Sequence, residues 1–146
     1  MLPDDRTTDA IAIRVFPPTP HRPITVINVY RPPVRSSGAD LREDNFNPIA
    51  FPHSPRLFVL GDLNAHHPSW DRNATPDPMG ETLDDWAAQR SMVCLNDGEA
   101  TRFDPSTAAT SAPDISFVPA RLASRCTWDR LEDIGSDHLP LLTSCR

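Results

Sequence analysis

The chain has 146 residues, a length typical of one domain that buries most of the surface its unfolded form exposes. Its 17 prolines and its hydrophobic share of 38% predict many loops, and the lack of any run of roughly 20 apolar residues excludes a membrane-spanning helix. The net charge of -6 argues against attachment to nucleic acid by a basic surface alone, although all 14 basic residues are arginines, which suit phosphate contacts or reflect coding bias.

The first nine residues, MLPDDRTTD, lack the basic and apolar regions of a secretory signal. A hairpin is expected directly after them. AIAIRVF at 10–16 and ITVINVY at 24–30 are rich in β-branched residues, and the proline-rich segment between them predicts a turn. Residues 31–55 show no sustained period and predict a long surface connection with one short helix near 39–43. RLFVL at 56–60 is continuously apolar, which indicates a strand covered on both faces.

The second half of the chain predicts one helix and several short strands. Leu83, Trp86, Ala87 and Arg90 recur at helical spacing and predict an amphipathic helix that covers a sheet. Strands are expected at 92–96, 100–103, 114–118, 125–131 and 139–144. Many short strands, few helices and no internal repeat favour a mixed α/β sandwich over an array of strand–helix–strand units.

Cysteine and histidine offer weak signals for metal or disulfide chemistry. Cys94, Cys126 and Cys145 are too few and too widely spaced for a disulfide framework or a four-cysteine zinc site, so we expect buried thiols in a reducing compartment. His66 and His67 are adjacent, so their side chains point apart on an extended segment, and no further ligand lies at zinc spacing. A zinc site is therefore disfavoured.

The loop GDLNAHHPSW at 61–70 directly follows the predicted strand 56–60. Asp62 and Asn64 would share one face of the strand end, where a carboxylate can bind a hard cation or accept a proton from water. The alternative is an ordinary turn whose side chains cap their own backbone. Tryptophans are expected in the core or at its rim, but Trp70 lies on this loop, where its ring could instead touch a sugar or base. The other two tryptophans are Trp86 and Trp128.

Two further acidic positions lie beside predicted strands. In Ser136-Asp137-His138, a histidine next to a carboxylate is a candidate acid or transition-state donor near neutral pH. Asp114 leads into the predicted strand at 114–118. Each pattern is also consistent with a turn or a strand-start cap, so neither by itself indicates catalysis.

Four motifs resemble, in order and separation, those of the endonuclease/exonuclease/phosphatase superfamily: NVY at 28–30, GDLN at 61–64, SAPD at 111–114 and SDH at 136–138. NVYRPP, GDLNAHHPSW, LNDGEATRF and SDHLP are most similar to the apurinic-type endonuclease domain of non-LTR retrotransposons. The resemblance implies a four-layer α/β sandwich, in which two mixed β-sheets are flanked by helices. It also implies a Mg²⁺- or Mn²⁺-dependent endonuclease that nicks target DNA for target-primed reverse transcription.

The resemblance implies that Asp62 activates the attacking water, with Asn64 beside it on the scissile phosphate. His138 would donate to a phosphoryl oxygen, oriented by Asp114. A cation and fixed donors would stabilise the charge that the phosphodiester gains under attack.

Three more residues would complete the implied site. Asp137 and Asp62 would bind the metal. Tyr30, Asn64 and Ser136 would contact the substrate phosphate, and Ser136 would also support the turn that carries SDH.

The resemblance covers only the C-terminal two-thirds of the family's domain, so residues 1–146 are expected to form a single domain with the N-terminal strands missing. The family's principal metal ligand is a glutamate upstream of the hairpin, and no glutamate here takes that place. The candidates all come later in the chain: Glu43, Glu81, Glu99 and Glu132. We therefore expect a truncated fragment with an open sheet edge and little or no nuclease activity on its own.

Two other functions remain open. One is another phosphoesterase of the superfamily, a phosphomonoesterase or lipid phosphodiesterase, and the other is a degenerate remnant that only binds a partner. The retroelement-like loops favour DNA as the substrate. The resemblance further implies a nuclear location and, in a full-length element, a reverse transcriptase domain C-terminal to this one, with no membrane partner.

Overall fold

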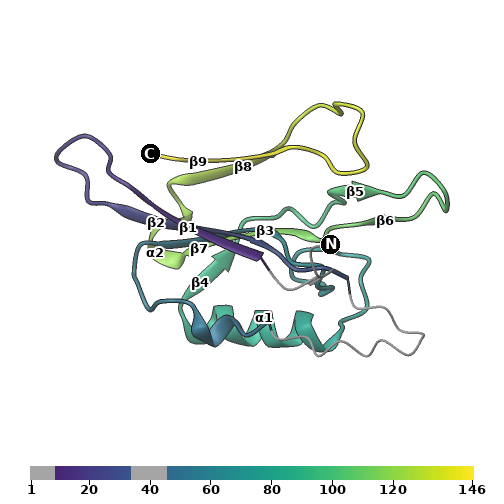
Figure 1. Cartoon of the computed structure of the whole chain (residues 1–146), viewed down its shortest axis with the longest axis horizontal. Coiled ribbons are helices and arrows are strands. Elements are labelled where there is room, and N and C mark those ends of the chain that lie inside the picture. Colours follow the sequence, from purple (N-terminus) through teal and green to yellow (C-terminus); the bar gives the residue numbers. More distant parts are fainter. Residues whose placement is uncertain (1–8, 34–45) are drawn as a thin grey trace, which may run out of the picture.

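A mixed five-stranded sheet lies at the centre of the computed structural model, which describes residues 9–33 and 46–146 (Figure 1). β2 and β3 are parallel, whereas the other neighbouring strands are antiparallel. The first strand is an edge strand with every residue exposed. The strand order is β1 (Asp9–Val15), β2 (Ile24–Tyr30), β3 (Leu57–Asp62), β7 (Asp114–Pro119) and β4 (Met92–Cys94).

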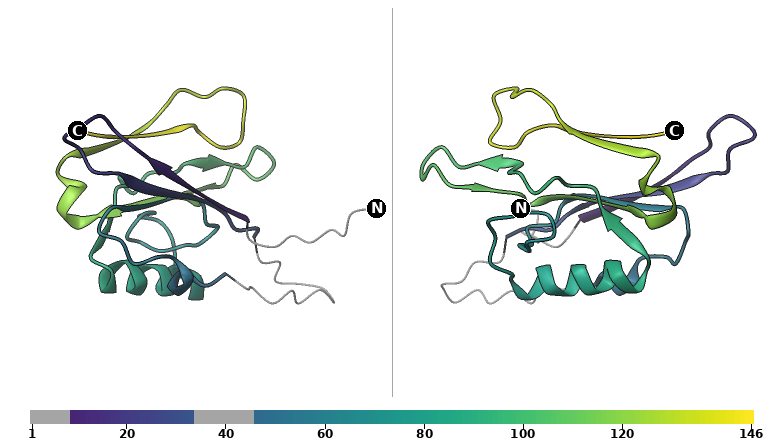
Figure 2. Two further views of the ribbon diagram at one scale, coloured as in Figure 1. Left: turned by 60° about the vertical axis from the view of Figure 1, so that its left-hand side comes forward. Right: turned by 180° about the vertical axis from the view of Figure 1, so that it is seen from behind.

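One helix, α1 (Pro78–Gln89), covers one face of this sheet (Figures 1 and 2). The helix begins at Asp77, whose carboxylate accepts a hydrogen bond of 2.6 Å from the Gly80 amide and so satisfies a free donor of the first turn. Trp86 packs edge-to-face on Phe117 of β7, with ring centroids 5.7 Å apart. The amphipathic helix predicted from the spacing of apolar residues is thus confirmed, and Arg90 caps its C-terminal end.

Two short ladders complete the fold. The hairpin of β8 (Cys126–Arg130) and β9 (Leu141–Cys145) lies on the side of the sheet opposite α1 (Figures 1 and 2). Trp128 ties it to the sheet, because its indole N–H donates to the Ser116 hydroxyl at 3.2 Å. The second ladder pairs β5 (Arg102–Phe103) with β6 (Thr110–Ser111). The described residues therefore form helix, sheet and hairpin layers.

The α/β class with mixed pairing is confirmed, as are the N-terminal hairpin and the strand covered on both faces. Three elements of two to four residues were not predicted, because such lengths show no periodicity. They are η1 (Pro48–Ala50), β6 and α2 (Ala120–Ala123). The helix expected at 39–43 lies outside the described residues. Within 9–33 and 46–146, no helix is long and apolar enough to cross a membrane.

The expectation of three buried thiols is wrong for two of them. Cys126 and Cys145 form a disulfide, since antiparallel pairing of β8 with β9 places these residues directly opposite each other. Their separation of 19 residues gave no hint of this pairing, because hairpin register is a property of the folded chain. Cys94 is free, and burial raises the pKa of its thiol to about 11.

Trp70 is fully buried, so its ring cannot touch a nucleic-acid base. Its indole N–H donates to the Ala65 carbonyl at 2.9 Å, and its ring packs edge-to-face on Phe117. The core reading is therefore correct, and the base-stacking alternative is wrong for this residue. The loop thus folds back over its own tryptophan.

Candidate active site

Three of the predicted site residues form a row across neighbouring strands. Tyr30 on β2 is paired with Asp62 on β3, and Asp62 is paired with Asp114 on β7. Because side chains alternate along a strand, Asp62 lies on the face opposite Val59, which packs into the core beneath α1. β2 and β3 end, and β7 begins, at the same end of the sheet. This arrangement brings the three residues together from positions far apart in the sequence.

Gly61 allows β2 and β3 to approach closely just before this row. Its φ of +133° is accessible mainly to glycine, and a Cβ atom there would lie 2.0 Å from the Val29 carbonyl oxygen. The loop then turns through Asn64, whose φ is +42°, and the Asn64 amide donates to the Asp62 carboxylate at 3.2 Å. The turn reading of GDLN therefore holds in part, because Asp62 does cap its own loop.

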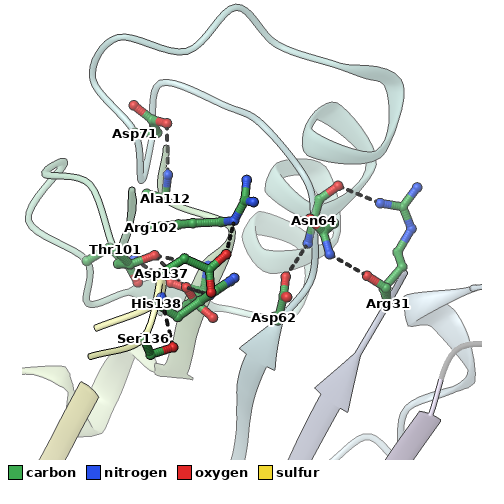
Figure 3. A network of polar contacts seen from close by, with 12 residues as sticks. Arg31, Asp62, Asn64, Asp71, Thr101, Arg102, Ala112, Ser136, Asp137 and His138 are labelled. Carbon is green, nitrogen blue, oxygen red and sulfur yellow. Dashed lines mark hydrogen bonds and ion pairs between the residues drawn. The ribbon is translucent and has the colours of Figure 1, made fainter. Parts of the chain in front are cut away.

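Arg31, to which the sequence assigned no role, anchors that loop (Figure 3). Its side chain is buried, and its guanidinium donates to the carbonyls of Leu63 at 3.1 Å and Asn64 at 2.7 Å. The Asn64 amide group donates in return to the Arg31 carbonyl at 2.7 Å. One hydrogen of the Asn64 side-chain amide is thus used in the contact with Arg31, and the other takes no part in this contact. The signal was available, since Arg31 belongs to the NVYRPP motif.

His138 is connected to the row by its contact with Asp114. The His138 Nδ1 lies 2.9 Å from the Asp114 Oδ2, and the Thr101 hydroxyl donates to the same oxygen at 2.6 Å. Since a carboxylate only accepts, His138 Nδ1 carries the proton and Nε2 is the nitrogen free for other chemistry. Thr101 is fully buried and lies in the LNDGEATRF segment, but the sequence pattern did not indicate a role for it.

The turn that carries His138 joins β8 to β9 and is held by polar contacts. Ser136 accepts a hydrogen bond of 3.2 Å from the His138 amide, which stabilises the turn. Asp137 forms an ion pair of 3.2 Å with Arg102, and its carbonyl accepts from the Phe103 amide at 2.8 Å. The connection between β8 and β9 is thus held against β5, and these contacts position His138.

Two residues to which the sequence analysis assigned no role, Asp71 and Asn96, stabilise the backbone around Asp114. Asp71 is buried and accepts from the Ala112 amide at 3.0 Å, which fixes the segment just before β7. Asn96 donates to the Asp114 carbonyl at 2.8 Å and accepts from the Ser116 amide at 3.0 Å. Asn96 lies in LNDGEATRF and Asp71 directly follows GDLNAHHPSW, but only the folded chain shows which backbone groups they bind.

Asp62, Asp114 and His138 have ligand atoms within 4.8 Å of one another. Burial raises the pKa of Asp62, and the nearby Asp114 carboxylate raises it further, whereas His138 opposes the shift. Two carboxylates held this close repel each other, which is the situation that a bound cation relieves. The donor set fits Mg²⁺ in its usual form, with one or two carboxylates and the other positions filled by water and phosphate.

Asp137, the other predicted metal ligand, and the two histidines of the disfavoured zinc site lie outside this trio. Asp137 is engaged with Arg102, and a role as a ligand remains a prediction. His67 bonds to the Ser69 hydroxyl at 2.9 Å and lies against Trp70, with ring centroids 5.2 Å apart. Among the described residues, neither His66 nor His67 belongs to a cluster with metal-ligand spacing.

Comparison with known proteins identifies a family and a similar fold. The family model described as endonuclease-reverse transcriptase matches residues 24–142. Among solved structures, the fold is similar to the endonuclease domain of TRAS1, a telomere-specific non-LTR retrotransposon, with a TM-score of 0.66 and 21% sequence identity. The match covers 98% of this chain and 69% of the TRAS1 chain. No protein of curated function matches the sequence significantly.

Proposed function

The chain belongs to the endonuclease-reverse transcriptase family, and we propose that it is the metal-dependent DNA endonuclease domain of a non-LTR retrotransposon. The observation that carries the proposal is the trio of Asp62, Asp114 and His138 at the edge of the central sheet. A base, a cation site and an oriented imidazole would then lie within reach of one phosphodiester. The reaction would be attack of water at phosphorus, which leaves a 5′-phosphate and a 3′-hydroxyl from which a reverse transcriptase can prime.

Asp62 is proposed as the group that activates the water. A carboxylate is an inefficient base when its pKa lies far below the working pH, and burial raises the pKa of Asp62. Its Oδ1 is held by the Asn64 amide, so the carboxylate has one fixed orientation. These properties support a role in proton abstraction as well as in cation binding.

His138 is proposed as the donor to the phosphoryl oxygen. Because Asp114 accepts from Nδ1, the imidazole is held with Nε2 directed away from the carboxylate, where it can donate to the substrate when protonated. Asp114 is then a positioning residue, and the 2.6 Å bond from Thr101 holds that carboxylate in turn. This arrangement resembles the carboxylate–imidazole pairs that fix a catalytic tautomer in other hydrolases.

Phosphate contacts are proposed for Tyr30, Asn64 and Ser136. Tyr30 is half exposed and stands beside Asp62 in the row, so its hydroxyl can reach a phosphate held there. Asn64 retains one amide hydrogen that is not used by Arg31. Ser136 holds the turn of His138 and can offer its hydroxyl hydrogen outward.

Mg²⁺ or Mn²⁺, held by Asp62 with Asp137 nearby, would neutralise charge on the phosphoryl oxygens. Asp114 is already bonded to Thr101 and His138, so Asp62 is the less committed carboxylate of the trio. We therefore propose that the chain alone binds its cation weakly and nicks DNA slowly. Residues 1–146 would form one domain corresponding to the C-terminal two-thirds of the family's domain, a proposal supported by its 69% coverage of the TRAS1 domain. A nuclear location and a C-terminal reverse transcriptase partner belong to the same proposal.

A plasmid-nicking assay with Mg²⁺ tests the function. We expect slow conversion of supercoiled to open-circular DNA that is lost with EDTA and with Asp62→Ala. The matched control is Asp129→Ala, which removes an equal charge from an exposed position on β8 and should leave nicking unchanged. Nicking that survives Asp62→Ala would contradict the proposed role of this residue.

The proposal of weak activity has its own test. A chimera that carries the first third of the TRAS1 domain ahead of residue 1 should nick faster than the chain alone. Fast nicking by the unmodified chain, equal to that of the chimera, would overturn the weak-activity proposal and leave the assignment to DNA cleavage intact.

A further inference from the structure

A basic cavity lies at the end of the central sheet opposite the candidate active site. It has a volume of about 510 Å³, and four arginines line it: Arg14, Arg22, Arg56 and Arg121. Thr25, also in its lining, pairs with Leu57 at the start of the β2–β3 ladder, whereas Tyr30 pairs with Asp62 at its end. Five residues of strand separate the two pairs, which corresponds to about 16 Å. The cavity is therefore separate from the trio of Asp62, Asp114 and His138.

The four arginines are not neutralised by acids. Among the described residues none of the four forms an ion pair, although Arg72, Arg102 and Arg130 pair with Glu99, Asp137 and Asp97. Concentrated positive charge of this kind is unusual in a chain with a net charge of -6, because acids elsewhere are available to compensate it. The arrangement indicates a place where an anion supplies the missing negative charge.

Two of the guanidinium groups are already held in place. Arg121 donates to the Pro55 carbonyl through Nε at 3.0 Å and Nη2 at 2.6 Å, and Arg56 donates to the Arg22 carbonyl at 3.4 Å. A carbonyl acceptor fixes orientation without cancelling charge, so little side-chain entropy remains to be lost when an anion binds. Arg14 lies over the Phe16 ring, with its Cζ 5.3 Å from the ring centroid.

We propose that this arginine cavity binds phosphate groups of a nucleic-acid backbone, at a second site distinct from the candidate active site. Arginine forks match phosphate oxygens in pairs, and several guanidiniums around one opening suit consecutive phosphates of a strand. The remaining lining of proline, serine and threonine offers no large apolar side chain to anchor a peptide. Binding at this site does not require the chain to cleave DNA, so it can be tested independently of the proposed function.

The test is fluorescence anisotropy with labelled oligonucleotides of equal length, as single-stranded DNA, duplex DNA and RNA, in EDTA at low salt. Without a cation the acidic edge of the sheet repels phosphate, so binding reports the arginine cavity. The double variant Arg14→Gln/Arg22→Gln removes two charges from side chains that make no hydrogen bond among the described residues. The matched control Arg72→Gln/Arg130→Gln removes two ion-paired charges elsewhere on the surface.

We expect the cavity variant to weaken binding by at least about tenfold and to flatten the salt dependence by roughly two phosphates, with less than a threefold change for the control. The three oligonucleotides then show which nucleic acid the site prefers. Equal losses in both variants would overturn the proposal, because net charge alone would explain them. Displacement of the oligonucleotide by polyglutamate of equal charge, at equal concentration, would also overturn it and indicate an acidic protein partner. Binding is measured in EDTA, where the proposed endonuclease does not cleave, so failure of this inference is separated from failure of the proposed endonuclease.

Discussion

The two halves of the candidate active site are built in different ways. Asp62 and Asp114 belong to central strands whose inward-facing residues are almost fully buried. His138 lies in the connection of a hairpin whose strands are mostly exposed and which is held by polar contacts and one disulfide. The acids are thus positioned by the core, whereas the histidine is positioned by a separate and weaker unit. The site can therefore lose its imidazole without losing its fold, and four predictions test that difference.

The largest effect is expected where the halves join. Asp114→Asn keeps the shape of the side chain but removes the charge that orients His138, so nicking should fall by about 10²-fold or more while the melting temperature changes little. Thr101→Val is the graded comparison, because it removes one donor to the same oxygen and should cost about tenfold. The initial nicking rates of both variants are measured in the chain alone or in the TRAS1 chimera, whichever nicks faster. Wild-type rates for Asp114→Asn would show that the two halves act independently.

Gly61→Ala should most strongly destabilise the half of the site that the central sheet carries. A Cβ atom at 2.0 Å from the Val29 carbonyl forces β2 and β3 apart, so we expect a loss of more than about 3 kcal/mol in the free energy of unfolding. Gly135→Ala is the matched control in the hairpin half, since its φ of +88° is similarly left-handed but no atom lies within 4 Å of the added Cβ. Strain alone should cost about 1–2 kcal/mol there. Urea unfolding of both variants decides the comparison, and equal losses would argue against close approach as the cause.

Reduction of the disulfide should first destabilise the β8–β9 hairpin, which carries His138. The bridge between Cys126 and Cys145 closes a loop with a sequence separation of 19, and opening such a loop costs about 3 kcal/mol. We expect amide hydrogen exchange with a reductant to accelerate in β8 and β9 while protection in β3 and β7 persists. Cys94→Ser controls for the free thiol. Simultaneous loss of protection in all four strands would show that the hairpin and sheet unfold as one unit.

The smallest effect concerns the charge of Asp62. Because its pKa is raised in the folded state, folding favours the protonated form, and stability is lost as the pH rises from the usual carboxyl pKa of 3.8 through the folded pKa. Asp62→Asn avoids this penalty and should raise the melting temperature at pH 7 in EDTA by roughly 1–4 °C while abolishing nicking. The gain should shrink toward acidic pH. A lower melting temperature than wild type at pH 7 would contradict the burial argument.

Much of the architecture could be predicted from local patterns. The β-branched alternation at 10–16 and 24–30 specified a hairpin, and the spacing of Leu83, Trp86 and Ala87 specified the helix that covers the sheet. Both patterns recur within a few residues, so neighbouring side chains alone carry them. β5 falls within the strand predicted at 100–103, whereas β6, with two residues, shows no periodicity and was missed. Arg31, Asp71 and Thr101 were assigned no role, because the hydrogen-bond partners that define their roles lie 13 to 41 residues away.

The sequence by itself determined which residues are candidates for the proposed chemistry, because Asp62, Asp114 and His138 stand in motifs whose order and spacing can be read directly. Only the tertiary structure decided how these side chains lie relative to one another. Strand register placed Asp62 opposite Asp114, and a hairpin closed by two cysteines brought His138 to the same carboxylate. Register and closure follow from burial and backbone pairing between distant segments, and no local pattern encodes them. The gathering of four arginines at the far end of the sheet has the same origin, since they come from separate segments of the chain.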